Sequence, residues 1–370
     1  MSTSSSKMFL SRNQVVTAAV HYISSPIFSE FPPRPLEEEL PSARRVNASF
    51  GRNRHPLKAN VWERESDMDI ATMDNATVDG LSRRLADTYN GSKLAVKFLT
   101  ASGWGPLLNL GYFELRQLPS LFGGLNYFQR YLVKKSVELL DPQPDESILD
   151  LACGNGWTTQ FIAQHGSQTT GVDLCEPHIK SAESNFGKAE NISFIQGDAT
   201  DLENVATPNS IDKIHCLEAA FHFGPEGREA LLNSAFRVLK PGGTFVLVDI
   251  TWRTDYPEQI DDLDPENTFR ETWQMEVFEP FERYTKNAKA IGFVERQILD
   301  WTKPVMRIFD FAASTIFMGQ HSLTRKALEI ARSEYSAITE HEWKLLLHEL
   351  RLTQRVMAQS RYAAYIFTKP

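Results

Sequence analysis

The sequence is poor in cysteine and has no excess of basic residues. Its 370 residues include three cysteines, Cys153, Cys175 and Cys216, and each lies in an apolar, strand-like stretch. This placement favours buried reduced thiols over a disulfide framework or a metal site, so we expect no bound metal. The 47 acidic residues exceed the 39 basic ones, whereas proteins that bind nucleic acid usually carry a basic surface. The composition therefore argues against a nucleic-acid partner.

Long apolar runs are also missing. The start, MSTSSSKMFLSRNQVV, lacks the apolar stretch and the small-residue cleavage site of a secretory signal, and no later run has the length of a membrane span. These absences predict a cytoplasmic protein without a membrane partner.

Residues 1–75 are polar and punctuated by prolines, without a sustained structural period. We interpret them as a partly disordered N-terminal extension. Residues 14–23 within it can form a short helix with one apolar face, which could dock on a second subunit. A homodimer held by this extension is therefore a hypothesis.

The sequence pattern of residues 76–370 is typical of one α/β domain with helical additions. Residues 76–140 have helical spacing around the loop GWGPLLNLGYFE and are expected to form a lid or substrate segment. From 141 to 303, short apolar runs alternate with amphipathic runs, which is the pattern of βαβ units. A helical cap is expected over 304–360, and 361–370 should form the last strand. The expected fold is a doubly wound, seven-stranded, mainly parallel sheet.

The elements of this core can be placed from the apolar pattern. Strands are expected near residues 148–152, 169–173, 192–196, 213–217, 244–249, 294–300 and 362–368. Intervening helices are expected near residues 157–165, 176–186, 228–239 and 279–291.

The most informative stretch is SILDLACGNGWTT. An apolar strand ends at Asp150, the turn Gly154-Asn155-Gly156 follows, and a helix begins after it. Glycines let a backbone turn sharply and approach a ligand, and a helix N-terminus offers free N–H groups. A second apolar strand ends at Asp173, where a carboxylate can accept hydrogen bonds from a ribose diol. The pattern predicts a site for an adenosine-containing ligand.

Two features separate this turn from a dinucleotide-binding fingerprint. Thr159 stands where that fingerprint has its third small residue, and Asp150 is hard to place beside a pyrophosphate. A carboxylate at this position suits a ligand with an ammonium group. S-adenosylmethionine has an ammonium group, a carboxylate, a ribose and an adenine, so we expect it as the cofactor. A nucleotide-binding oxidoreductase is the alternative.

Four stretches in order, DLACGNG, GVDL, QGDATDL and LEAAFHFGPEGREALLNSAFRVLKPGG, resemble the motifs of class I, Rossmann-like methyltransferases. The resemblance covers about residues 108–243 and the last strand. It implies that Asp198 lies near the adenine amino group and that Leu217 and Glu218 flank the methionine part. The cofactor-binding residues that it implies are Asp150, Ala152, Gly154, Asn155, Gly156, Asp173, Leu174, Gly197, Asp198, Ala199, Leu217 and Glu218. Asp150, Asp173 and Asp198 could instead cap a turn or helix or face water.

His222 follows the fourth strand, at the end of the sheet where ligands of open α/β folds bind. An imidazole suits a general base because its unperturbed pKa lies near neutrality, and Asp249 after the fifth strand would orient it. The sequence here resembles quinone, sugar and other natural-product O-methyltransferases. It implies O-methyl transfer to a small apolar or aromatic secondary metabolite, with His222 and Asp249 as catalytic residues. Alternatives are C- or N-methylation, a methylating cyclase, a carboxyl methyltransferase without a base, and a His222 that only bonds loop backbone.

Three aromatic residues are expected around the substrate. Tyr112 resembles the lid residue that covers the cofactor in those enzymes, although it could instead pack a helix on the core. Phe221 and Trp252 should line the acceptor site, which favours a flat, apolar acceptor. A methyltransferase acting on RNA or protein would need a basic strip or an RNA-binding module, neither of which is visible. A non-catalytic or cyclising relative is a second rival.

Overall fold

The computed structural model describes residues 82, 84, 88, 93–114, 124–255 and 259–370. The chain divides into two units, Met1–Val78 and Asp79–Pro370, and the described residues belong to the second. The hypotheses about residues 1–75, including the dimer helix at 14–23, concern a part of the chain outside the described residues.

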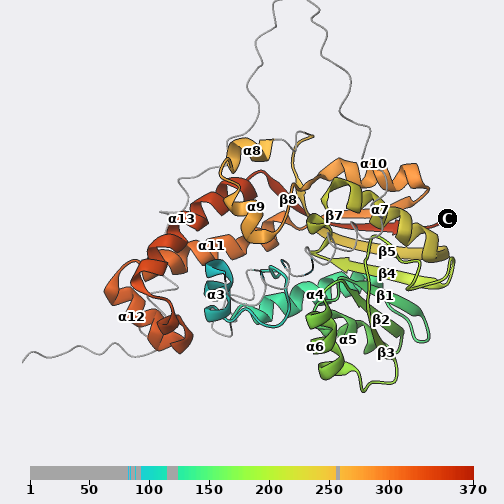
Figure 1. The fold of residues 1–370 in the computed structure, drawn as a ribbon, viewed down its shortest axis with the longest axis horizontal. Coiled ribbons are helices and arrows are strands. Elements are labelled where there is room, and N and C mark those ends of the chain that lie inside the picture. Colours follow the sequence, from blue (N-terminus) through green and yellow to red (C-terminus); the bar gives the residue numbers. More distant parts are fainter. Residues whose placement is uncertain (1–81, 83, 85–87, 89–92, 115–123, 256–258) are drawn as a thin grey trace, which may run out of the picture. The chain divides into compact units, whose positions relative to one another are not determined.

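Among the described residues, the sheet of the second unit contains eight strands. The order is β3-β2-β1-β4-β5-β8-β7, and β6 pairs with β5 (Figure 1). The strands are β1 (Ser147–Leu151), β2 (Gln168–Asp173), β3 (Ile192–Gln196), β4 (Ile211–Leu217), β5 (Leu239–Trp252), β6 (Glu279–Pro280), β7 (Val294–Asp300) and β8 (Ser360–Thr368). β1 to β5 pair in parallel, whereas β8 runs antiparallel between β5 and β7. The expected mainly parallel α/β sheet is confirmed.

Helices cover both faces of the sheet. Val246, Val248 and Ile250 of β5 belong to the core under α4 (Asn126–Leu140) and α5 (Trp157–Ala163). The alternating residues Phe245 and Leu247 belong to the core under α7 (Gly224–Val238) and α10 (Phe281–Ile291). Two adjacent residues of β5 therefore face opposite sides of the sheet, so polar side chains on this strand also point to one side or the other.

Helix boundaries differ from the prediction where proline and short elements intervene. α6 (Glu176–Phe186) is as expected, but α7 begins at Gly224 rather than at 228 because Pro225 suits the first helical turn. The segment expected to be helical from 279 starts instead with β6, and Pro280 precedes α10. Two short helices, α8 (Gln259–Leu263) and α9 (Thr268–Trp273), were not expected, because so few residues carry no helical period.

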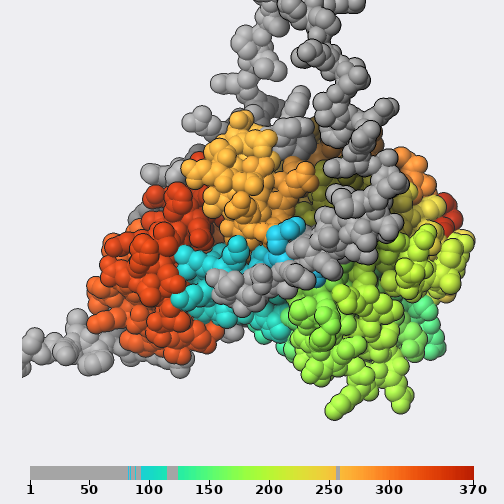
Figure 2. Space-filling model, in the orientation of Figure 1, coloured from blue at the N-terminus to red at the C-terminus, as the bar shows by residue number. Residues whose placement is uncertain are grey.

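A helical cap precedes the last strand, as expected. It comprises α11 (Thr302–Gly319), α12 (Ser322–Ala331), η4 (Ser333–Ala337) and α13 (Glu340–Met357). These helices pack with α3 (Leu94–Ala101) around a third core that includes Phe98 and Trp343, whose rings meet edge to face at 6.1 Å. In Figure 2, the cyan segment that contains α3 lies between these red and orange helices and the green residues of the sheet region. No helix in the described ranges is long and apolar enough to cross a membrane.

Candidate active site

Two non-glycine residues at the edge where the parallel strands end have a strained backbone. Ala152 directly follows β1 and Glu218 directly follows β4, and their φ angles of 53° and 50° lie in the left-handed region. This conformation is unfavourable for residues other than glycine and persists only where the surrounding structure enforces it. β1 and β4 are neighbours, so the two strained residues lie at adjacent strand ends. Such strain is typical of functional sites.

The two glycines of the turn after β1 have different surroundings. A Cβ on Gly156 would lie 2.7 Å from Cζ of Phe194 and 2.9 Å from Cβ of Ala182, so this glycine permits the helices and strands to pack. A Cβ on Gly154 would meet Cδ1 of Leu108 at 3.6 Å, which is ordinary contact. Within the described residues, the space above Gly154 therefore remains open to a ligand.

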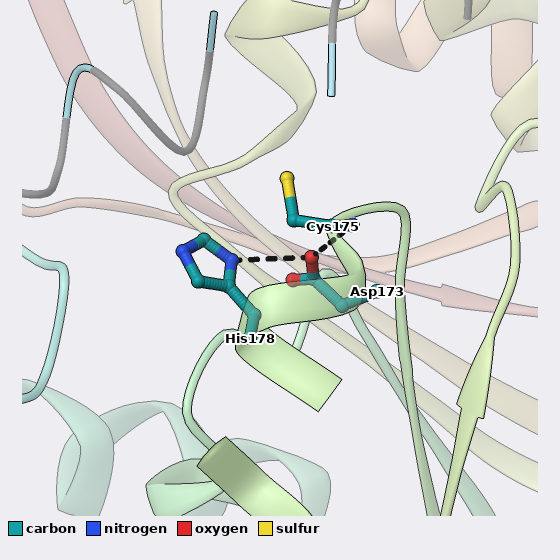
Figure 3. A group of neighbouring side chains, drawn as sticks. All are labelled: Asp173, Cys175 and His178. Atoms are coloured by element: carbon teal, nitrogen blue, oxygen red, sulfur yellow. Dashed lines mark hydrogen bonds and ion pairs between the residues drawn. The ribbon is translucent and has the colours of Figure 1, made fainter. Parts of the chain in front are cut away.

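Asp173 at the end of β2 is tied to this turn. Its Oδ2 accepts a hydrogen bond from the Gly154 backbone N at 2.9 Å. Its Oδ1 accepts one from the Cys175 backbone N at 2.8 Å (Figure 3). His178 Nδ1 lies 3.2 Å from the same Oδ1. Burial lowers the pKa of His178, but hydrogen bonds with Asp173 and Cys175 outweigh it and raise that pKa to about 10. A charged imidazole thus holds the carboxylate in place.

The side chains of Asp173, Cys175 and His178 also form a set that a transition metal could use, because their ligand atoms lie within 4.8 Å of one another. The carboxylate, however, already accepts backbone hydrogen bonds on both oxygens and pairs with the imidazole. We interpret the group as a support for the Asp173 carboxylate.

The ends of β2 and β3 meet beside Asp173. Gly197 N donates to the Asp173 backbone oxygen at 3.0 Å, and the Leu174 backbone oxygen accepts from Gln196 Nε2 at 3.2 Å. Asp198 Oδ1 accepts from the backbone N and hydroxyl of Thr200. The structure thus brings Gly154, Asp173, Leu174, Gly197 and Asp198 to one edge. Five further predicted cofactor residues lie at the same strand ends: half-buried Ala152, Asn155 and Leu217, and buried Ala199 and Gly156.

Asp150 differs from its expected role. Its Oδ2 accepts from the Thr159 hydroxyl at 2.7 Å, and its Oδ1 lies 2.9 Å from His215 Nδ1. His215 Nε2 in turn lies 3.0 Å from Ser136 Oγ, and all four side chains are buried. Asp150 therefore joins β1, β4, α4 and α5, and the structure gives it partners inside the protein rather than an open ligand face.

An apolar cavity lies between the sheet edge and the helical cap. Its polar lining residues are Asn109, Glu218, Glu349 and Thr353. Apolar residues supply the rest: Ala95, Phe98, Leu99, Trp104, Leu108, Leu110, Phe221, Ile250, Phe269, Trp273, Met275, Phe278, Ile308, Phe309, Ala312, Ile316, Leu346, Leu350 and Met357. Such a lining suits a mainly apolar ligand whose few polar groups form hydrogen bonds with single polar side chains.

Glu218 is the polar group where this cavity meets the sheet. Its carboxyl accepts hydrogen bonds from the Tyr362 hydroxyl at 2.6 Å and from the Leu110 backbone N at 2.9 Å. Burial raises the pKa of Glu218 to about 8, although these two hydrogen bonds oppose the shift. Sequence reasoning placed Glu218 beside the cofactor but missed Tyr362.

Neither predicted catalytic residue lines the cavity, although the ring of His222 lies 4.0 Å from that of Phe221, which does. His222 is half-buried, its Nδ1 lies 3.0 Å from the Gln274 backbone oxygen, and burial lowers its pKa to about 4. Asp249 Oδ2 accepts from the Tyr284 hydroxyl at 2.7 Å. Tyr284 belongs to α10, so Asp249 faces the opposite side of β5 from Ile250, which lines the cavity. Strand alternation therefore turns Asp249 away from an acceptor in this cavity.

The three predicted aromatic residues have separate positions. Phe221 lines the cavity. Trp252 is fully buried in the core, 5.9 Å from the ring of Phe278, and so lies behind the cavity wall instead of in it. Tyr112 packs edge to face against Tyr131 and Trp301.

Comparison with known proteins identifies the domain at this edge. Residues 148–243 match the family model described as "Methyltransferase domain". This stretch is a methyltransferase domain. It runs from β1 into β5 and contains the glycine turn, Asp173, Asp198 and Glu218, and domains of this class use S-adenosylmethionine.

Two curated relatives carry methyltransferase names. An uncharacterized methyltransferase of Synechocystis sp. is 33% identical over 114 residues, which are 31% of this chain and 51% of the relative. The erythromycin 3''-O-methyltransferase of Saccharopolyspora erythraea is 29% identical over 206 residues, 52% of this chain and 64% of the relative. The chain thus spans about half to two thirds of the length of these relatives.

Solved structures confirm the fold over a longer stretch. A cyclopropane synthase of Mycobacterium tuberculosis superposes with a TM-score of 0.58 at 19% identity, covering 78% of this chain and 98% of that one. A [4+2]-cyclase superposes with a TM-score of 0.55 at 17% identity, covering 78% and 97%. At these identities the likeness concerns the fold alone.

The residues at the strand ends fit S-adenosylmethionine. The open space above Gly154 can admit a ligand. Oδ2 of Asp173 accepts from the Gly154 backbone N and keeps a second lone pair, which suits a ribose hydroxyl. Leu174 and Asp198 lie at the ends of the neighbouring strands β2 and β3. Asp150 does not add to this fit, because its oxygens are engaged by Thr159 and His215.

Proposed function

We propose that this chain transfers the methyl group of S-adenosylmethionine to an apolar small molecule bound in the cavity. The observation that carries the proposal is that one residue borders both the glycine turn and the cavity. Leu108 borders the open space above Gly154 and also lines the apolar cavity, and the neighbouring Leu110 donates its backbone N–H to Glu218. A cofactor at the glycine turn and an acceptor in the cavity would therefore be neighbours.

Methyl transfer requires the chain mainly to position the acceptor relative to the cofactor. The cofactor supplies an activated methyl group on a positively charged sulfur. The chain's residues orient the acceptor, exclude water and receive a proton when the acceptor atom is a hydroxyl. Apolar side chains such as Phe221, Ile250 and Met275 would hold the acceptor and keep water away.

We propose oxygen as the acceptor atom. The relative that acts on erythromycin is named as an O-methyltransferase, which supports this choice. The carboxyl group of Glu218, which can take up a proton, also lines the cavity where it meets the cofactor site. The chemistry of fold neighbours is more varied, since they include a cyclopropane synthase and a cyclase. A methylated carbon or a product without a new methyl group is thus the outcome that would overturn this part.

The sequence-based hypothesis makes His222 the general base. Burial lowers its pKa to about 4, which keeps the ring neutral at physiological pH but makes it a weak proton acceptor, and His222 is not among the residues that line the cavity. If the hypothesis holds, His222→Ala should lower turnover by about 10²- to 10⁴-fold while S-adenosylhomocysteine affinity stays nearly unchanged. Near-normal turnover of the variant would remove His222 from the reaction.

We further propose a cytoplasmic protein that acts on small molecules and not on nucleic acid, which the acidic composition supports.

The experiment is a transfer assay with methyl-labelled S-adenosylmethionine and a metabolite extract. Labelled products are separated between water and an organic solvent and identified by mass spectrometry. We expect label in apolar, methoxylated products. Label in the aqueous phase alone, or in nucleic acid or protein, would contradict the proposal. Gly154→Val is the control, since a branched side chain should fill the space above the turn.

A further inference from the structure

We propose that Glu218, held by the Tyr362 hydroxyl and the Leu110 backbone N–H, accepts the proton of the acceptor's hydroxyl group. The inference rests on the proposed function and names the catalytic residue of that site. It departs from the hypothesis that His222 fills this role.

Location is the first support. Glu218 lines the cavity, whereas His222 and Asp249 do not. It also directly follows β4, next to the end of β1 from which the glycine turn starts. Glu218 therefore stands at the boundary between the acceptor cavity and the cofactor site.

The surroundings of the carboxyl are the second support. Tyr362 lies on β8 opposite Ile250 of β5 and reaches across the sheet face to Glu218. The Tyr362 hydroxyl and the Leu110 backbone N–H both donate, so they favour the ionised carboxylate. Oε1 accepts from both donors and Oε2 accepts from the Leu110 backbone N–H alone among the described residues, so a lone pair on Oε2 remains for the acceptor's proton. Tyr362 acts through Glu218 and is a positioning residue.

Burial brings the pKa of the Glu218 carboxyl near the pH at which a general base works best. Burial, opposed by the hydrogen bonds from Tyr362 and Leu110 and assisted by the charge of Asp249 on the neighbouring strand, raises the pKa of Glu218 to about 8. A carboxylate in water is too weak a base for a hydroxyl, whereas one with a pKa near the working pH is suited to general base catalysis.

The proposed step is balanced. The acceptor's O–H bond breaks and its proton passes to Glu218, a new O–C bond forms to the methyl carbon, and the C–S bond breaks with its electron pair remaining on sulfur. The thioether product is neutral, and the proton on Glu218 is later lost to solvent.

The first test measures transfer and binding. Methyl-labelled S-adenosylmethionine is offered with a mixture of phenols and long-chain alcohols. Glu218→Gln should lower turnover by about 10²- to 10⁴-fold, a much larger factor than any loss of S-adenosylhomocysteine affinity measured by calorimetry. Turnover by Glu218→Gln within threefold overturns this inference while leaving the proposed function intact. No transfer by the natural chain overturns both.

The second test does not depend on turnover. Difference infrared spectroscopy follows the carbonyl band of the protonated Glu218 carboxyl as pH rises, and Glu218→Gln identifies the band. We expect half-protonation well above the range of an exposed glutamate, and a further upward shift in Tyr362→Phe, because a donor that favours the carboxylate is lost. Tyr365→Phe is the matched control: its hydroxyl donates to Phe281 O on the opposite face of the same strand, so the midpoint should not move. An ordinary midpoint, or equal shifts in both tyrosine variants, contradicts the proposal.

Discussion

The contrast between Gly154 and Gly156 gives a prediction with two separable readouts. Both glycines have positive φ, 53° and 82°, and an alanine in that conformation costs about 1–2 kcal/mol. At Gly156 the added Cβ would also press against Phe194 and Ala182 at 2.7 and 2.9 Å, and such overpacking costs a further ~1–3 kcal/mol. At Gly154 the Cβ meets Leu108 at 3.6 Å and adds no such cost.

We therefore expect Gly156→Ala to lower the free energy of unfolding by about 2–5 kcal/mol, and Gly154→Ala by only about 1–2 kcal/mol. For the affinity for S-adenosylhomocysteine we expect the reverse order, with the larger loss in Gly154→Ala. Gly154→Ala should bind it at least about tenfold more weakly, a loss of ~1.4 kcal/mol, because the methyl group enters the ligand's space. Guanidinium unfolding measures the first quantity and calorimetry the second.

Gly242→Ala is the matched control. Gly242 has φ of 83° and nothing within 4 Å of its Cβ position, so this variant measures the backbone cost alone. The reasoning is refuted if Gly154→Ala binds S-adenosylhomocysteine as tightly as the natural chain. It is equally refuted if Gly156→Ala is no less stable than Gly242→Ala.

Three further predictions follow from the site and the sequence. Asp173→Ala should weaken S-adenosylhomocysteine binding by about 1–3 kcal/mol through lost charge-assisted hydrogen bonds, and an unchanged calorimetric affinity would contradict the assignment. Between pH 4.5 and 8 the folded protein keeps a proton on Glu218 that the unfolded chain releases, so stability falls as pH rises through this window; guanidinium unfolding at several pH values should show a smaller fall in Glu218→Gln. If the homodimer hypothesis holds, removing residues 1–75 should leave the domain folded and convert a dimer to a monomer in light scattering; an insoluble product would show that the segment belongs to the core.

Local sequence patterns were sufficient for much of the fold. Short apolar runs marked the strands from β1 to β5, and the glycine turn and Asp173 are adjacent to strands that periodicity identifies. These features depend on neighbours in sequence. The same local signals cannot show β6, whose two residues pair with the far end of β5.

The orientation of buried polar groups depended on distant partners. Asp150 turns toward His215 and, through it, toward Ser136 of α4, and no local pattern shows that these side chains meet. Asp249 and Ile250 are adjacent in sequence, but only the packing of the cap helices decides that the cavity lies on the Ile250 side. The contact between Glu218 and Tyr362 requires the antiparallel register of β8 beside β5.

The central claim is that an apolar acceptor is methylated inside the cavity, and blocking the cavity tests it most directly. Ala312 of α11 lines the cavity, whereas the residues of the cofactor site lie at the strand ends. Ala312→Phe should fill acceptor space, so transfer of labelled methyl groups to apolar products should fall by at least about tenfold while S-adenosylhomocysteine affinity stays unchanged. Unchanged transfer to the same products would show that the acceptor binds elsewhere and would contradict the account.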